Sequence, residues 1–168
     1  RYIAAVRELN RQDWRVATHA VGDAAIDLVL NAYEKANADQ SIVGRRWSIE
    51  HAFIGRPDHL PRMKALGIAI SAQNHLYLAG PSLVKYWGAS RAGITTPVKM
   101  YLDAGLPVSS GTDAPVVPEE ELIFQASMAV GIGLDPEVAL RGATIHPAKA
   151  VGIDNRAGSI EPGKDADL

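Results

Sequence analysis

The sequence predicts an α/β fold built on a parallel sheet. Short apolar runs alternate with longer segments whose apolar residues recur at helical spacing, and this strand–helix order is typical of parallel strands. About four such units fit into the 168 residues. Because a complete eight-unit barrel needs about 250 residues, the chain is either a small open sheet or about half of a barrel.

The composition indicates a folded domain and excludes several function classes. The chain is 47% apolar and 21% charged, with a formal net charge of −2 and no Lys/Arg run longer than two, so nothing points to nucleic acid or an acidic membrane surface. It contains no cysteine, so any metal must be held by nitrogen and oxygen. It shows no signal peptide and no apolar stretch near the roughly 20 residues that cross a bilayer, so we expect a cytoplasmic location.

The first part of the chain alternates clearly between helix and strand patterns. We expect a helix over 2–10, a strand over 15–19, a helix from 23 to about 36, a strand over 46–51, a short helix from 58 to 66 and a strand over 68–73. The second helix rests on an apolar stripe at i, i+3, i+4 and i+7, formed by Ile26, Val29, Leu30 and Tyr33. Asp23 can cap its first turn, and Gly67 is the expected end of the third helix.

The second part begins with a segment that shows no clear pattern. Residues 74–94 are expected to form a long loop, and loops of that length inside a domain are usually functional. The expected elements after it are a helix from 97 to 105, a strand over 107–113, a helix over 119–130, a helix over 135–144 capped by Asp135 and a helical turn over 147–152.

Three polar residues follow three of the expected strands. His19, His51 and Asp113 each come where an apolar run ends. The carboxyl ends of parallel strands lie along one edge of a sheet, where catalytic groups gather, so we expect these side chains to converge. Two imidazoles and a carboxylate suit a catalytic zinc, which takes three protein ligands and keeps one position for water. The plainer alternative is that each of them only caps a strand end or a turn.

The other histidines are less informative. His75 follows the strand over 68–73 and either contacts substrate or is an ordinary loop residue. His59 lies at the start of a short helix and is expected to be solvated, whereas His146 precedes Pro147 and is expected to pack or to cap.

Four motifs carry a resemblance to a known family: THAVGD (18–23), IEHA (49–52), SGTDAP (110–115) and the tail GSIEPGKDADL (158–168). Together they resemble the metal-dependent amidohydrolases, and more narrowly amidohydrolase family 3, the group similar to N-substituted formamide deformylases. The resemblance covers essentially the whole chain, in order and at sensible spacing.

The resemblance implies a (β/α)8 barrel beside a small β-sandwich. His19 would end strand five and His51 strand six, both as metal ligands, and Asp113 would end strand eight as a metal ligand and general base. Gln73 and His75 would end strand seven, near the substrate. Residues 1–152 would then be barrel units five to eight, and residues 153–168 the start of the return to the sandwich.

The departures from the family pattern define what we expect of this chain. The His-x-His pair of strand one and the carboxylated lysine of strand four are absent, and both ends look cut. We therefore expect the C-terminal half of a hydrolase that cleaves a non-peptide C–N bond, amide or N-formyl, with one or two divalent ions, most favourably zinc. Metal binding in this chain alone should be weak, and the chain alone should be inactive.

The sequence also leaves two alternative functions open, and it predicts self-association. The chain could be a complete small α/β ligand-binding domain without catalysis, or part of a barrel hydrolase that acts on phosphoesters or lactones. Half a barrel leaves one sheet face and two strand edges open, so we expect a homodimer or higher oligomer. The candidates for an apolar inner face are Val16, Ile49, Ile70 and Val108.

Overall fold

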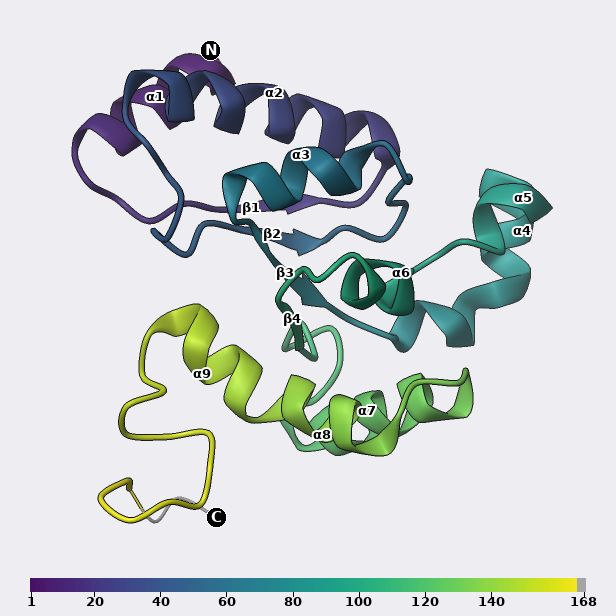
Figure 1. The fold of residues 1–168 in the computed structure, drawn as a ribbon. Helices are drawn as coiled ribbons and strands as arrows, with labels where there is room; N and C mark the ends of the chain where they lie inside the picture. Colours follow the sequence, from purple (N-terminus) through teal and green to yellow (C-terminus); the bar gives the residue numbers. More distant parts are fainter. Residues whose placement is uncertain (166–168) are drawn as a thin grey trace.

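The computed structural model describes residues 1–165, and Tyr77 in its backbone only. Four strands, β1 (Ala17–Ala20), β2 (Ser48–His51), β3 (Ala69–Ala72) and β4 (Val108–Ser110), form one parallel sheet in the order β1-β2-β3-β4 (Figure 1). This sequential order is that of an arc of a barrel, because an open doubly wound sheet reverses its strand order at a switch point.

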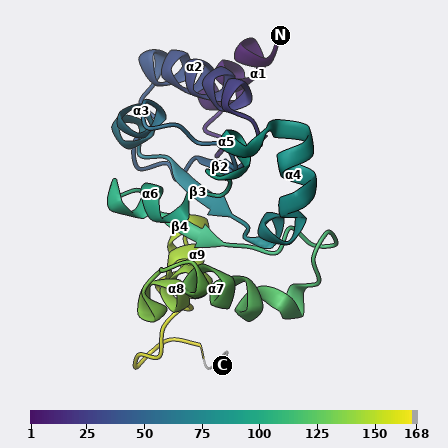
Figure 2. The same ribbon diagram turned by 90° about the vertical axis from the view of Figure 1, so that its right-hand side faces the viewer.

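Helices return the chain between successive strands and continue after the last one (Figure 2). They are α1 (Tyr2–Arg11), α2 (Asp23–Asp39), α3 (His59–Leu66), α4 (Gly80–Trp87), α5 (Ala89–Ala92), α6 (Val98–Asp103), α7 (Leu122–Gly131), α8 (Pro136–Ala143) and α9 (Ile145–Val151), with short 3₁₀ turns η1 (His75–Ala79) and η2 (Glu119–Glu121). None of the helices within residues 1–165 is long and apolar enough to span a membrane.

The core lies between one face of the sheet and the helices that cover it. Ile49, Ile70 and Val108 pair across β2, β3 and β4 and are all buried. The expected stripe of α2 is confirmed, since all four of its members are buried. Its Tyr33 ring packs edge-on against Trp47 at 4.8 Å, and its hydroxyl donates a 2.9 Å hydrogen bond to the Ser48 carbonyl oxygen. This contact fixes α2 against β2.

The expectation of an apolar inner face is wrong. Val16, Ile49, Ile70 and Val108 are buried on the face that the helices cover. Side chains alternate along a strand, so the opposite face carries the neighbouring residues of each strand, which are small or polar: Ala17, His19, Ser48, Glu50, Ala69, Ser71 and Ser109. The four apolar residues therefore meet the chain's own helices and need no partner.

The expected loop over 74–94 is mostly helical. It contains η1, α4 and α5, and Leu83 is the one buried apolar residue of α4 and α5. Its contacts with the rest of the domain include buried Asn74, whose backbone N–H donates to Gln125 Oε1 at 2.8 Å, and Arg91, whose guanidinium lies 3.1 Å from the Asp23 carboxylate. Asp23 does not cap α2, because the helix begins at Asp23 itself and its N-cap position is Gly22, without a side-chain hydrogen bond. Short helices held by distant partners leave little local pattern in a sequence.

Other expected helix ends are confirmed. The Asp135 carboxylate accepts hydrogen bonds from the backbone N–H groups of Glu137 and Val138. Gly67 ends α3 in the left-handed conformation, with φ +65°, and Gly152 ends α9 in the same way. Beyond Gly152 the described chain, up to Asp165, is irregular, and the last three residues of the tail motif lie outside the described part.

His59 is fully buried, so the expectation that it is solvated is wrong. Its Nδ1 accepts a hydrogen bond from the Arg56 backbone N–H at 3.2 Å, and its Nε2 lies 3.2 Å from Asp27 Oδ1. Arg56 and Arg62 also contact Asp27, at 3.0 and 3.2 Å, and Arg62 pairs with Glu34. This ionic cluster joins α2 to α3, which no local pattern in the short third helix reveals.

Gly55 has no room for a side chain, which yields a prediction for stability. A Cβ at this position would lie 1.8 Å from the hydroxyl of buried Tyr101, which donates a 2.6 Å hydrogen bond to the Ala52 carbonyl oxygen. Overpacking of this kind costs about 1–3 kcal/mol, so Gly55→Ala should lower the free energy of unfolding in urea by about that amount. Gly131→Ala is the control, because a Cβ there meets nothing within 4 Å. Equal stability of the two variants would contradict the packing.

The buried imidazole of His59 predicts how stability varies with pH. Burial is the largest cause that lowers the pKa of His59 below its usual 6.5, and the positive charge of Arg56 adds to the shift, against the opposing carboxylates of Asp27 and Asp58. As the pH falls below about 6.5, the unfolded chain gains a proton that the folded chain resists, so stability should fall. The stability cost of His59→Gln, measured by urea unfolding, should therefore be smaller near pH 5 than near pH 8. A cost independent of pH would contradict this.

Candidate functional site

His19 and His51 meet at the carboxyl edge of the sheet. His19 is the third residue of β1 and His51 the last residue of β2, and their rings pack edge-on with centroids 4.5 Å apart at 75°. His51 has a positive φ of +76°, so it leaves the alternation of β2 and turns its ring toward the ring of His19. His19 is exposed and His51 is buried, so the pair lies at a boundary with solvent.

Phe53 links this pair to the next strand. Its ring stacks on His51 with centroids 5.2 Å apart at 30°, and the ring of His75 lies edge-on to Phe53 at 5.9 Å. The Phe53 carbonyl oxygen accepts a 2.8 Å hydrogen bond from the backbone N–H of Thr96, where the chain returns from α5. The sequence analysis missed Phe53, and the only local signal was an aromatic residue two positions after a candidate ligand.

Gln73 contacts a candidate ligand directly. Its Oε1 lies 2.7 Å from His51 Nδ1, and both side chains are buried. Gln73 and His75 were both expected near substrate at the end of the third strand. The structure places Gln73 against His51 and places His75 against Phe53, so the two residues face different neighbours.

Asp113 lies on the same edge, in the loop after β4, with a positive φ of +62° and an exposed side chain. The charge of Asp113 acts on the pKa of His75. Burial lowers the pKa of His75, the charge of Asp113 opposes this shift, and His51 adds to it. His19, His51 and Asp113 nevertheless do not form a closed ligand set, because their ligand atoms are not all within 4.8 Å of one another.

Within the described chain, one group of three acidic or imidazole side chains does meet that distance: Asp27, Asp58 and His59. The contacts of this group indicate ion pairs rather than metal ligation. Because His59 Nδ1 accepts a hydrogen bond from the Arg56 backbone, the neutral ring carries its proton on Nε2 and has no lone pair there for a metal. Arg56 also contacts both carboxylates of the group, at 3.0 and 2.8 Å.

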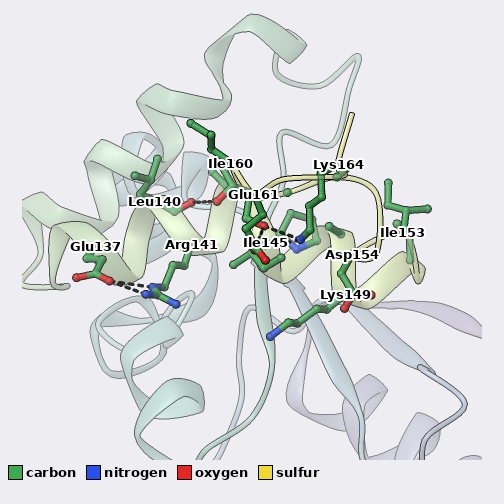
Figure 3. A pocket seen from close by; sticks show the side chains of 18 residues that line it. Glu137, Leu140, Arg141, Ile145, Lys149, Ile153, Asp154, Ile160, Glu161 and Lys164 are labelled. Carbon is green, nitrogen blue, oxygen red and sulfur yellow. Dashed lines mark hydrogen bonds and ion pairs between the residues drawn. The ribbon is translucent and has the colours of Figure 1, made fainter. Parts of the chain in front are cut away.

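A large groove lies elsewhere, between α8, α9 and the tail (Figure 3). It combines apolar side chains such as Leu140 and Ile145 with charged ones, of which Arg141 pairs with Glu137 at 2.7 Å. None of the five expected site residues lines it. The residues with candidate chemistry therefore gather at the carboxyl edge of the sheet and not in this groove.

Comparison with known proteins shows the family of the chain. A family model described as "Amidohydrolase family" matches residues 3–168. The chain is 35% identical over 170 residues to N-substituted formamide deformylase of Arthrobacter pascens, a match that covers 91% of this chain and 30% of the relative. It is 42% identical over 72 residues to imidazolonepropionase of Thermoplasma acidophilum, which covers 42% of this chain and 18% of the relative.

The fold also matches a solved structure over almost its whole length. An uncharacterized metal-dependent hydrolase of Pyrococcus furiosus superposes with a TM-score of 0.81 at 28% identity, covering 98% of this chain and 35% of that protein. The chain thus spans about a third of the length of these longer proteins. The expected fold class, part of a larger barrel, is confirmed. On its sequence and its fold, this chain belongs to the amidohydrolase family.

Proposed function

We propose that this chain is part of a metal-dependent hydrolase that cleaves a non-peptide C–N bond, in an amide or an N-formyl group. The observation that carries the proposal is the contact of the His19 and His51 rings at the carboxyl edge of the sheet, where Asp113 also lies. The names of two relatives, a formamide deformylase and an imidazolonepropionase, support a substrate with a carbon–nitrogen bond.

The donor set fits a divalent metal, most favourably zinc. His19 and His51 offer nitrogen and Asp113 offers oxygen, and zinc takes both kinds of ligand. The contact of His51 Nδ1 with the Gln73 amide oxygen leaves Nε2 of His51 available as a ligand. A bound zinc would activate water at neutral pH and polarise a carbonyl group. We infer from the resemblance that a longer protein would supply the remaining ligands and hold one or two ions, and that this chain alone binds metal weakly.

The chain's own residues account for proton transfer and for part of the pocket wall. Asp113 is exposed on its loop, so its carboxylate can accept a proton from the attacking water and pass it to the departing nitrogen. Phe53 and the partly buried His75 form an aromatic wall beside His51. We assign His75 to contact with substrate, because its ring packs against Phe53 beside His51 at the carboxyl edge of the sheet.

The organisation of the parent protein is part of the same proposal. We infer that residues 1–152 supply barrel units five to eight and that residues 153–168 lead toward a second domain. The regular elements of the described chain end with α9 at Val151, which supports a boundary there. A small-molecule substrate and a cytoplasmic location complete the proposal, and activity is expected from the longer protein rather than from this chain alone.

The role of Asp113 gives a prediction for activity. In the full natural chain, loaded with zinc, Asp113→Asn keeps the size of the side chain but removes its charge and basic oxygen. Turnover of N-formyl or amide substrates should fall by about 10²–10⁴-fold, the usual contribution of a general base. The measurement is steady-state kinetics on a panel of N-formyl compounds, amides, phosphoesters and lactones.

Asp103→Asn is the matched control, since Asp103 is an exposed aspartate on α6 that pairs with Lys99 at 2.8 Å. It should leave turnover unchanged. Near-normal turnover of Asp113→Asn would show that another group is the base. Hydrolysis of phosphoesters or lactones only would contradict the C–N assignment, and binding without hydrolysis of any compound would favour a ligand-binding domain.

The open sheet edges predict self-association of the 168-residue chain. Within the described residues, β1 pairs with no strand but β2 and β4 with no strand but β3, although at the β4 edge the Val108 carbonyl oxygen already lies 3.0 Å from His146 Nδ1. Such edges favour pairing with another chain, and two half-barrels related by a two-fold axis would close both. We expect a homodimer in sedimentation velocity at micromolar concentration. A monomer under these conditions would contradict the proposed assembly.

A further inference from the structure

The amide of Gln73 is enclosed between two neighbouring strands. On one side its Oε1 lies 2.7 Å from His51 Nδ1, and on the other its Nε2 lies 3.4 Å from Ser71 Oγ. Only 3% of Gln73 is exposed. A side chain this enclosed is held against His51, which gives Gln73 a role beyond the place near the substrate that the resemblance implies.

The contacts of the amide determine which His51 nitrogen carries the proton. With Nε2 of Gln73 facing the Ser71 hydroxyl, the oxygen of the amide faces His51. An amide oxygen only accepts, so the neutral His51 ring donates from Nδ1 and keeps the lone pair on Nε2. The remaining nitrogen is the one that is free to bind a metal or another ligand.

Gly111, in the loop directly after β4, leaves room for this position of the Gln73 amide. A Cβ on Gly111 would lie 3.2 Å from Gln73 Nε2 and 3.6 Å from Ser71 Oγ. Gly111 precedes Asp113 by two residues, in the loop that leaves β4. The absence of a side chain there leaves the space that the Gln73 amide occupies.

We propose that Gln73 is a positioning residue that holds the neutral His51 ring in its Nδ1–H tautomer and so presents Nε2 of His51 to the site. The importance of this role for hydrolysis rests on the proposed function. The tautomer of His51 does not depend on the proposed function, so it can be measured separately.

The test uses the full natural chain with ¹⁵N-labelled histidine, freed of metal by dialysis against a chelator. Two-bond ¹H–¹⁵N spectra near pH 8, where free histidine is neutral, report the tautomer of each ring, and the signals lost in His51→Gln assign His51. The wild-type protein should show the Nδ1–H form. Gln73→Leu should lose it, whereas Gln73→Glu, whose carboxylate also accepts from Nδ1, should retain it.

Ser71→Ala is the graded variant: it removes the longer 3.4 Å contact that orients the amide but keeps the Gln73 oxygen, so it should reduce the Nδ1–H preference of His51 less than Gln73→Leu does. Zinc titration of the same proteins should show affinity about 10–100-fold lower for Gln73→Leu than for wild type, with Gln73→Glu close to wild type.

Three results would overturn the inference: an Nε2–H tautomer of His51 in the wild-type protein, an Nδ1–H tautomer that survives Gln73→Leu, or zinc affinity unchanged in that variant. A confirmed tautomer together with no hydrolysis of any compound in the substrate panel would instead count against the proposed function and leave the role of Gln73 standing.

Discussion

Parallel pairing of four successive strands is the constraint on which the site depends. The register aligns Thr18, Ile49, Ile70 and Val108 across the sheet, so the carboxyl ends of all four strands lie along one edge. Residues far apart in the sequence, such as His19 and His51, are thereby neighbours at that edge, and the same register turns the apolar positions of β2, β3 and β4 toward the covering helices. One pairing pattern therefore produces both the core and the candidate site.

The geometry at this edge is supported by residues from adjacent strands. His51 is held by Gln73 from the end of β3 and by the Phe53 ring, while Phe53 also meets His75. The backbone contributes as well, since His51 and Asp113 both adopt positive φ where their chains leave the sheet. Contacts of this kind restrict the orientation of the His51 ring. A side chain that binds a catalytic metal needs such a fixed orientation.

The limited span of the chain has physical consequences. It spans about a third of the length of the relatives that it matches, and it presents a sheet whose outer strands pair with no further strand in the described residues and whose second face carries small and polar side chains. On the other side of the sheet, the core and the ionic cluster of Asp27, Arg56, His59 and Arg62 are complete within the described residues. The apolar residues of the described chain are thus packed by its own helices on one side of the sheet, while the other side carries the small and polar residues.

The sequence by itself determined the features that depend on local periodicity and chain order. It predicted the strand–helix alternation, the α2 stripe and the cap at Asp135, because patterns that repeat every two or every 3.6 residues can be found in a single segment of the chain. Only the tertiary structure decided which sheet face is covered, that His59 is buried beside Asp27, that residues 74–94 form helices held partly by the Arg91–Asp23 pair, and that Gln73 contacts His51. Each of these depends on a contact between segments distant in sequence, and such a contact leaves no periodic pattern in either segment.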